Sequence, residues 1–141
     1  MTLRSALFVL PCCLLVPAAG CGRSSPARRV WGTVTYQGRP VEEGQIVFFP
    51  IEGTTGPSTG AAIEQGRYDV PARTGPYAGG VYRVEITALG PERTYSPNVS
   101  GEPPLITVRD PLIPPAFNRD STLRVTIADR TGDNQHDFDL E

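Results

Sequence analysis

Cysteine and histidine are scarce in this sequence of 141 residues, which holds three cysteines and a single histidine. Cys12 and Cys13 lie in an apolar N-terminal segment that we expect to be removed, so Cys21 is the only thiol left and an intrachain disulfide is excluded. A zinc site takes about four ligands, which one cysteine and one histidine do not supply. A catalytic thiol needs a neighbouring base, and His136 lies far along the chain, in the last predicted strand.

Lysine is absent, and the 13 arginines form no basic cluster. Removing Arg4 with the leader leaves 12 basic and 15 acidic side chains, one basic side chain fewer than in the full sequence. A surface that binds nucleic acid carries clustered positive charge. We therefore expect no nucleic-acid partner.

No apolar run is long enough to span a membrane, which needs roughly 20 residues. Residues 7–16 are apolar and follow Arg4, a pattern typical of a secretory signal peptide, and residues 18–20 are the small residues Ala-Ala-Gly that precede Cys21. We predict a signal peptide over 1–20 and interpret Cys21 as an attachment point, because this spacing resembles a lipobox. Ala18 stands where a leucine is usual in such motifs, and ordinary cleavage at the small residues is the alternative. Two or more acyl chains on Cys21, at roughly 0.8 kcal/mol per buried CH₂, would hold the protein to membrane lipid.

Glycine and proline, 15 of each, separate short runs with period-two alternation, and no window shows the periodicity of an amphipathic helix. This pattern predicts an all-β fold, a β-sandwich of seven to eight short strands. Between residues 89 and 122 seven prolines interrupt the chain, and we expect only 105–109 to form a strand in this irregular excursion. The other expected strands lie at 30–36, 45–49, 60–63, 67–70, 81–88, 123–127 and 138–140.

Three short motifs within and between the expected strands resemble those of a known family of proteins. The chain resembles small bacterial (planctomycete-type) lipoproteins with a carboxypeptidase-regulatory-like or transthyretin-like domain. The matching positions are Gly32, Val34, Gly38, Pro40 and Val41; Gly80, Tyr82, Val84 and Ile86; and Ile113, Pro114, Phe117 and Asn118, with Phe117 in place of the group's tyrosine. The resemblance implies a single prealbumin-like Greek-key sandwich over 30–141 after a tether at 21–29. It also implies a lipoprotein of the cell envelope that faces the periplasm or the cell exterior, with no established reaction or ligand.

Two aromatic residues are candidates for ligand contact. Trp31 should point opposite to the core residues Val30 and Val34, and Tyr77 lies in a loop rich in glycine and proline. The acidic residues of the C-terminal segment lack the pattern of a calcium loop, and we interpret them as the solvated face of a strand rather than a metal site. We predict no catalytic residue, metal or cofactor. These acidic residues are Asp129, Asp133, Asp137, Asp139 and Glu141.

The functional hypothesis that follows is a lipid-anchored, non-enzymatic extracytoplasmic module. Its loops would bind or scaffold envelope proteins or glycans, because loops on a rigid sandwich commonly carry function. The alternative is a hydrolase of the transthyretin-like type, or the accessory domain of a peptidase. Such hydrolases use several histidines and a C-terminal Y-R-G-S, whereas this chain ends in FDLE, and the H-x-x-E pair of zinc carboxypeptidases is missing.

Overall fold

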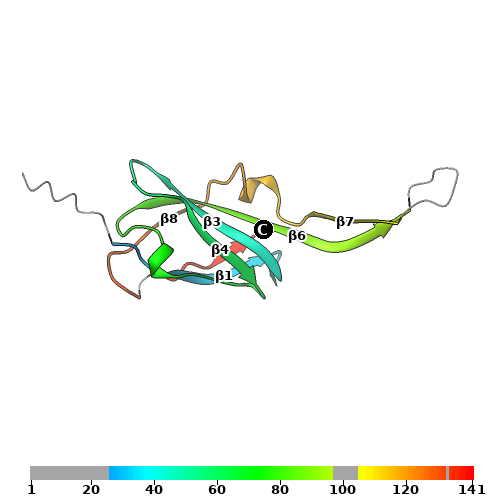
Figure 1. Ribbon diagram of the computed structural model, residues 1–141, viewed down its shortest axis with the longest axis horizontal. Helices are drawn as coiled ribbons and strands as arrows, with labels where there is room; N and C mark the ends of the chain where they lie inside the picture. The colour runs from blue at the N-terminus through cyan, green and yellow to red at the C-terminus, as the bar shows by residue number, and fades with distance from the viewer. Residues whose placement is uncertain (1–25, 97–104, 133) are drawn as a thin grey trace, which may run out of the picture.

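The computed structural model describes residues 26–96, 105–132 and 134–141, and in these parts the chain is all-β with two short 3₁₀ turns (Figure 1). The predicted all-β sandwich is confirmed. The elements are β1 (Val30–Tyr36), β2 (Arg39–Pro40), β3 (Glu43–Ile51), β4 (Thr59–Glu64), β5 (Arg67–Val70), η1 (Ala72–Thr74), β6 (Val81–Tyr95), β7 (Ile106–Pro111), η2 (Pro115–Phe117), β8 (Arg124–Thr126) and β9 (Phe138–Leu140).

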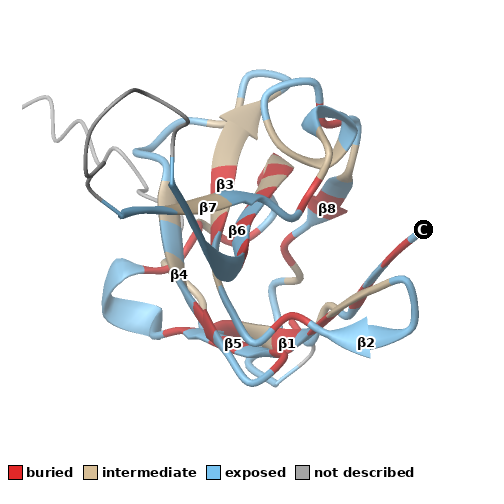
Figure 2. Cartoon of the chain, turned by 90° about the vertical axis from the view of Figure 1, so that its right-hand side faces the viewer, coloured by how far each residue is buried: buried red, intermediate tan, exposed pale blue. Residues whose placement is uncertain are grey.

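One continuous sheet runs in the order β2-β1-β5-β4-β3-β6-β7, while β8 pairs with β6 and β9 pairs with β1. The β1–β9 pair is parallel, and the other strand pairs are antiparallel. The sheet folds over so that β1 and β5 lie opposite β3, β6 and β8, with β4 passing between the two layers (Figure 2). Strands of both layers carry buried residues (Figure 2).

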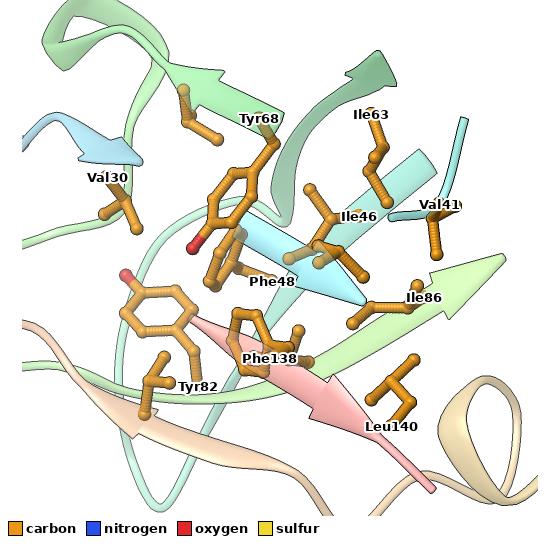
Figure 3. Close-up of a cluster of buried hydrophobic side chains, with 14 of the residues drawn as sticks. Val30, Val41, Ile46, Phe48, Ile63, Tyr68, Tyr82, Ile86, Phe138 and Leu140 are labelled. Atoms are coloured by element: carbon orange, nitrogen blue, oxygen red, sulfur yellow. The ribbon is translucent and has the colours of Figure 1, made fainter. Parts of the chain in front are cut away.

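The core consists of every second side chain of facing strands (Figure 3). The rings of Phe48, Tyr68 and Phe138 pack at tilted angles, with centroids 6.1 and 6.2 Å apart. The buried Tyr68 hydroxyl donates a hydrogen bond of 2.7 Å to the carbonyl of His136, which satisfies its polar end. Each fully buried apolar side chain of this kind stabilises the fold by about 1.5–3 kcal/mol. The alternation therefore also determines which side chains point outward and are free for function.

Two tight turns determine the register of the hairpins. Gln37 and Gly38 have φ of 50° and 70°, and Gln65 and Gly66 have φ of 49° and 73°. Positive φ at both central residues is the geometry of a two-residue hairpin turn that matches strand twist. The first turn joins β1 to β2, and the second joins β4 to β5, which contain the expected strands 60–63 and 67–70.

Strand β3 contains the expected strand 45–49, whose residues 46–49 are apolar on both faces. It lies between β4 and β6, and Ile46 and Phe48 are fully buried in the core. Its other face is covered less: Val47 and Phe49 are half-buried, and the Arg83 guanidinium lies 5.3 Å from the centre of the Phe49 ring. The outer face of β3 is therefore shielded from solvent by long side chains such as Arg83 and not by another layer of strands.

The prediction that 105–109 is the only strand between residues 89 and 122 is wrong. Strand β6 continues to Tyr95 and pairs with β7, and this two-stranded ribbon, here called the arm (residues 89–95 and 106–111), projects beyond the body (Figure 1). A register shift between Leu89 and Glu92 lets Pro91 sit inside the strand. Residues 97–104 lie outside the described residues.

The described chain begins at the end of the body opposite the arm (Figure 1). The Arg28 amide donates to the Pro76 carbonyl at 2.8 Å, and the Ala78 amide donates to the Pro26 carbonyl at 3.1 Å. The part of the predicted tether that is described therefore lies against the body. Cys21 and the predicted signal peptide fall outside the described residues. Within the described ranges, no helix has the length and apolar character to cross a membrane.

Candidate functional site

Trp31 lies on the outer face of β1, as the alternation predicted, and is half-buried there. It is paired with Asp69 of β5 on one side and bridged to Gln135 on the other. The Arg29 guanidinium stacks over the indole, 4.9 Å from the ring centre. Such a cation–π contact is weak at an exposed site, and it places the guanidinium over a surface that a ligand can reach. The ring is therefore held between polar groups of three neighbouring segments.

Arg29 is fixed in this position by Asp69. Its Nε donates to Oδ1 at 2.8 Å and its Nη2 donates to Oδ2 at 2.6 Å, a two-pronged ion pair with both side chains about half exposed (54% and 51%). The hydrogen bond to Arg29 lowers the pKa of Asp69, and the same pair raises the pKa of Arg29. Because the planar fork matches the carboxylate, the guanidinium is preorganised over Trp31.

A shallow hollow of about 910 Å³ opens beside this pair. It exists because β4 and β5 are paired only near their shared turn, at Ile63–Tyr68 and Glu64–Arg67, and diverge beyond it. Two arginines and two acidic residues border the hollow, so its formal charges cancel. We call this surface the Trp31 face; its residues are Arg29, Trp31, Thr33, Glu64, Arg67, Asp69 and Gln135.

Two acidic residues border the Trp31 face on its far side: Asp137, which directly precedes β9, and Asp139 within β9. Asp137 Oδ1 accepts hydrogen bonds from the Thr33 amide (2.7 Å) and hydroxyl (2.9 Å), and Asp139 accepts one from the Thr35 hydroxyl (2.6 Å). The side-chain and backbone hydrogen bonds from Thr33 lower the pKa of Asp137. Both carboxylates lie on the outward face of the strand, and the described residues bring no three His, Cys, Asp or Glu side chains together as a metal site.

Tyr77 lies in a different place from Trp31. Its ring packs against Gly56, with a ring carbon 3.0 Å from the point where a side chain on Gly56 would begin. Its amide donates to the Tyr82 hydroxyl at 2.8 Å. It borders a separate, smaller hollow of about 260 Å³. The two aromatic candidates are therefore not parts of one site.

His136 has an environment that does not favour proton transfer. The imidazole is half-buried, and no group among the described residues makes a hydrogen bond to its buried Nε2. Burial lowers the pKa of His136, with an opposing influence from Asp137. Neither the hollow beside Trp31 nor the one beside Tyr77 is lined by His136, whose backbone amide donates to the Trp31 carbonyl at 2.9 Å.

Sequence reasoning missed two parts of the surface. Arg29 and Asp69 were not recognised as partners, although the outward position of Asp69 follows from the buried Tyr68 and Val70 on either side of it. A hollow of about 640 Å³ at the base of the arm was also missed, because the arm itself was not predicted. Leu89 and Leu112 border this hollow and remain 49% and 38% exposed.

Comparison with known proteins gives no family for the chain. No family model matches, and no curated protein matches. Among solved structures, a 9R-lipoxygenase from Cyanothece PCC8801 aligns with 82% of this chain and 16% of its own, at 11% identity and a TM-score of 0.33. A similarity this low carries no argument about fold or function.

Proposed function

We propose that the chain is a lipid-anchored, extracytoplasmic, non-enzymatic module that binds a neutral glycan of the cell envelope on the Trp31 face. The observation that carries the proposal is the Arg29–Trp31–Asp69 arrangement at the edge of an open hollow without net charge. It combines an aromatic surface, a fixed planar cation and a carboxylate on one rigid sheet face.

A sugar ring matches these groups in two ways. Its C–H bonds form an apolar face that packs on the exposed part of an indole, and its hydroxyl groups both donate and accept hydrogen bonds. Around Trp31, Asp69 and Glu64 accept while Arg67 and Gln135 donate, all on exposed residues. Hydrogen bonds to charged groups contribute about 1.5–3 kcal/mol each. The charges that line the hollow cancel, and Asp137 and Asp139 add negative charge at its border, so an anionic ligand is disfavoured.

The geometry favours a glycan over a protein partner at this surface. A stable protein interface buries roughly 1,200–2,000 Å² and has an apolar centre from which charged residues are depleted. The Trp31 face has the opposite composition, because four charged side chains surround a single aromatic ring. If an envelope protein bound here, these four charged side chains would lose their water at the centre of the interface.

The anchor in this proposal is Cys21, supported by the apolar segment and small residues that precede it. The absence of catalysis is supported by the sequence, which holds one histidine and no H-x-x-E pair, and by the buried Nε2 of that histidine. A general base must reach a substrate proton, and this atom does not face an open surface.

Binding of purified envelope polysaccharides to the chain from residue 21, made soluble by Cys21→Ser, tests the proposal by calorimetry. We expect Trp31→Ala to weaken binding about tenfold or more, equivalent to about 1.4 kcal/mol. Asp69→Asn, which releases Arg29, should weaken it in the same direction. Tyr95→Ala is the matched control, since Tyr95 is an aromatic residue of the arm that is 52% exposed and lies outside the Trp31 face.

Unfolding temperatures measured in parallel show whether each variant is folded. Equal affinity of folded Trp31→Ala and the unaltered chain would contradict the binding site. Turnover of a ureide or peptide substrate that is lost in His136→Asn would contradict the non-enzymatic assignment.

A further inference from the structure

Both strand edges of the arm are open among the described residues, since β3 pairs with β6 only as far as Ala88 and β8 only at residues 81–83. Strand β7 ends the sheet order, and among residues 26–96, 105–132 and 134–141 no strand pairs with its outer edge. Apolar side chains are exposed toward the outer end of the arm: Tyr95 is 52% exposed, Leu105 74% and Ile106 36%. A two-stranded ribbon is marginally stable in water without further pairing or cover. The arm therefore has an unsatisfied edge and apolar surface at the same place.

Both edges of the arm are protected near the body, and β7 is unprotected farther out. Natural edge strands are protected by prolines and charged side chains. Such residues are Pro91, Glu92 and Arg93 on β6 and Arg109, Asp110 and Pro111 on β7, whereas residues 106–108 of β7 are Ile-Thr-Val, all β-branched and uncharged. The next residue, Arg109, is turned inward: its Nε donates to the Gly90 carbonyl at 2.9 Å, and its Nη2 to Glu43 at 3.1 Å.

Charge indicates which strand fits the β7 edge. In an antiparallel pair of two β7 strands centred on Val108, Arg109 faces Thr107 of the other copy and Asp110 faces Ile106, so no like charges meet. In a parallel pair in register, Arg109 would face Arg109 and Asp110 would face Asp110, and directly opposed like charges are destabilising. The charge pattern therefore favours a two-fold, antiparallel arrangement, which closes on itself without forming fibres.

We propose that a second copy of this chain pairs with β7 edge to edge, antiparallel across a two-fold axis at Val108. The two arms form a four-stranded sheet, and the exposed apolar side chains near the arm ends are covered by the other copy. The two bodies lie at opposite ends of this sheet, because each arm projects away from its own body (Figure 1). The inference does not depend on glycan binding or on the lipid anchor.

Introducing a charge at position 108 tests this pairing. In the proposed dimer, residue 108 of one copy lies directly opposite residue 108 of the other copy. In the soluble chain from residue 21 with Cys21→Ser, sedimentation velocity across a concentration series should show a dimer. We expect Val108→Lys and Val108→Glu each to lose the dimer, since like charges would then meet at the axis. An equal mixture of the two variants should restore it, as a heterodimer in which the introduced lysine of one copy faces the introduced glutamate of the other.

The matched controls are Thr126→Lys and Thr126→Glu, which place the same charges on an exposed position of β8, away from the arm. Both controls should keep the dimer of the unaltered chain. A monomer at every concentration of the unaltered chain would overturn the proposal. So would dimers that persist in both single Val108 variants, or a mixture that remains monomeric while unfolding temperatures show both variants to be folded.

Discussion

At the scale of single residues, Arg29 and Asp69 determine how much of Trp31 is offered to a ligand. The guanidinium covers part of the ring and is fixed there by two hydrogen bonds to one carboxylate. An exposed ion pair of this kind contributes little to stability, because solvent screens it and two side chains lose freedom. Its main consequence is therefore the position of Arg29, which a ligand can use as a ready-made donor beside the indole.

The half-buried imidazole of His136 should make the stability of the protein depend on pH. Its pKa in the native protein lies below the ordinary value of 6.5 because burial penalises the charged imidazolium. As the pH falls below 6.5, the unfolded chain takes up a proton before the native protein does. The free energy of unfolding should therefore fall by at most about 1.4 kcal/mol per pH unit, until the lower native pKa is reached.

Urea unfolding at a series of pH values above and below 6.5 measures this slope. In His136→Asn, which does not titrate, the slope should vanish over the same range. Asp69 and Asp137 have lowered pKa values and contribute stability that is lost only as the pH falls below about their ordinary value of 3.8, so they do not confuse the test. A slope that is identical with and without His136 would contradict this account of the imidazole.

At the scale of elements, the parallel contact of β1 with the segment leading into β9 depends on Gly32. A Cβ at this position would lie 1.9 Å from the His136 carbonyl oxygen. Because backbone must move to accommodate it, we expect Gly32→Ala to lower the free energy of unfolding by about 3 kcal/mol. Gly90→Ala is the control, since its Cβ would meet the Asp110 carbonyl oxygen at 3.5 Å, an ordinary contact.

Thermal and urea unfolding of the two alanine variants compares these sites directly. Gly90→Ala should unfold close to the unaltered protein. Equal destabilisation of both variants would show that the close approach of β1 to His136 is not what requires glycine at position 32.

The strands that face the core were predictable, because burial of one face leaves an alternating pattern in the sequence. Val30 and Val34 in β1, or Tyr82 to Ala88 in β6, show that pattern directly. The arm was not predictable in this way, since neither face of a two-stranded ribbon is buried and no alternation is required. Pro91 suggested a break, but a bulge beside it lets the strand continue.

The Trp31 face was predictable only in part. The outward position of Trp31 follows from the alternation in β1. Its neighbours do not, because the β1–β5 register that brings Asp69 beside it joins residues far apart in the sequence. Tyr77 gave a similar signal from its loop, yet its ring packs against Gly56 in a separate hollow.

At the scale of the whole molecule, the described chain begins at one end and the arm projects from the other (Figure 1). An anchor at Cys21 would precede the described chain by five residues, and the described chain begins opposite the arm, so the proposed anchor and the proposed pairing of two arms are compatible. We expect acyl labelling of the unaltered chain when it is expressed in a bacterium, and recovery in the membrane fraction. Cys21→Ser should lose both. An unlabelled, soluble unaltered chain would contradict the anchor while leaving the Trp31 face untouched.

The central claim is that the ligand contacts the face around Trp31, and the sequence offers a direct probe because it holds one tryptophan. Titration of the folded chain with the bound envelope polysaccharide, followed by tryptophan emission, should change the intensity and wavelength of Trp31 fluorescence in step with binding measured by calorimetry. Tyr95→Ala should give the same curve. Complete binding with unchanged Trp31 emission would contradict the account.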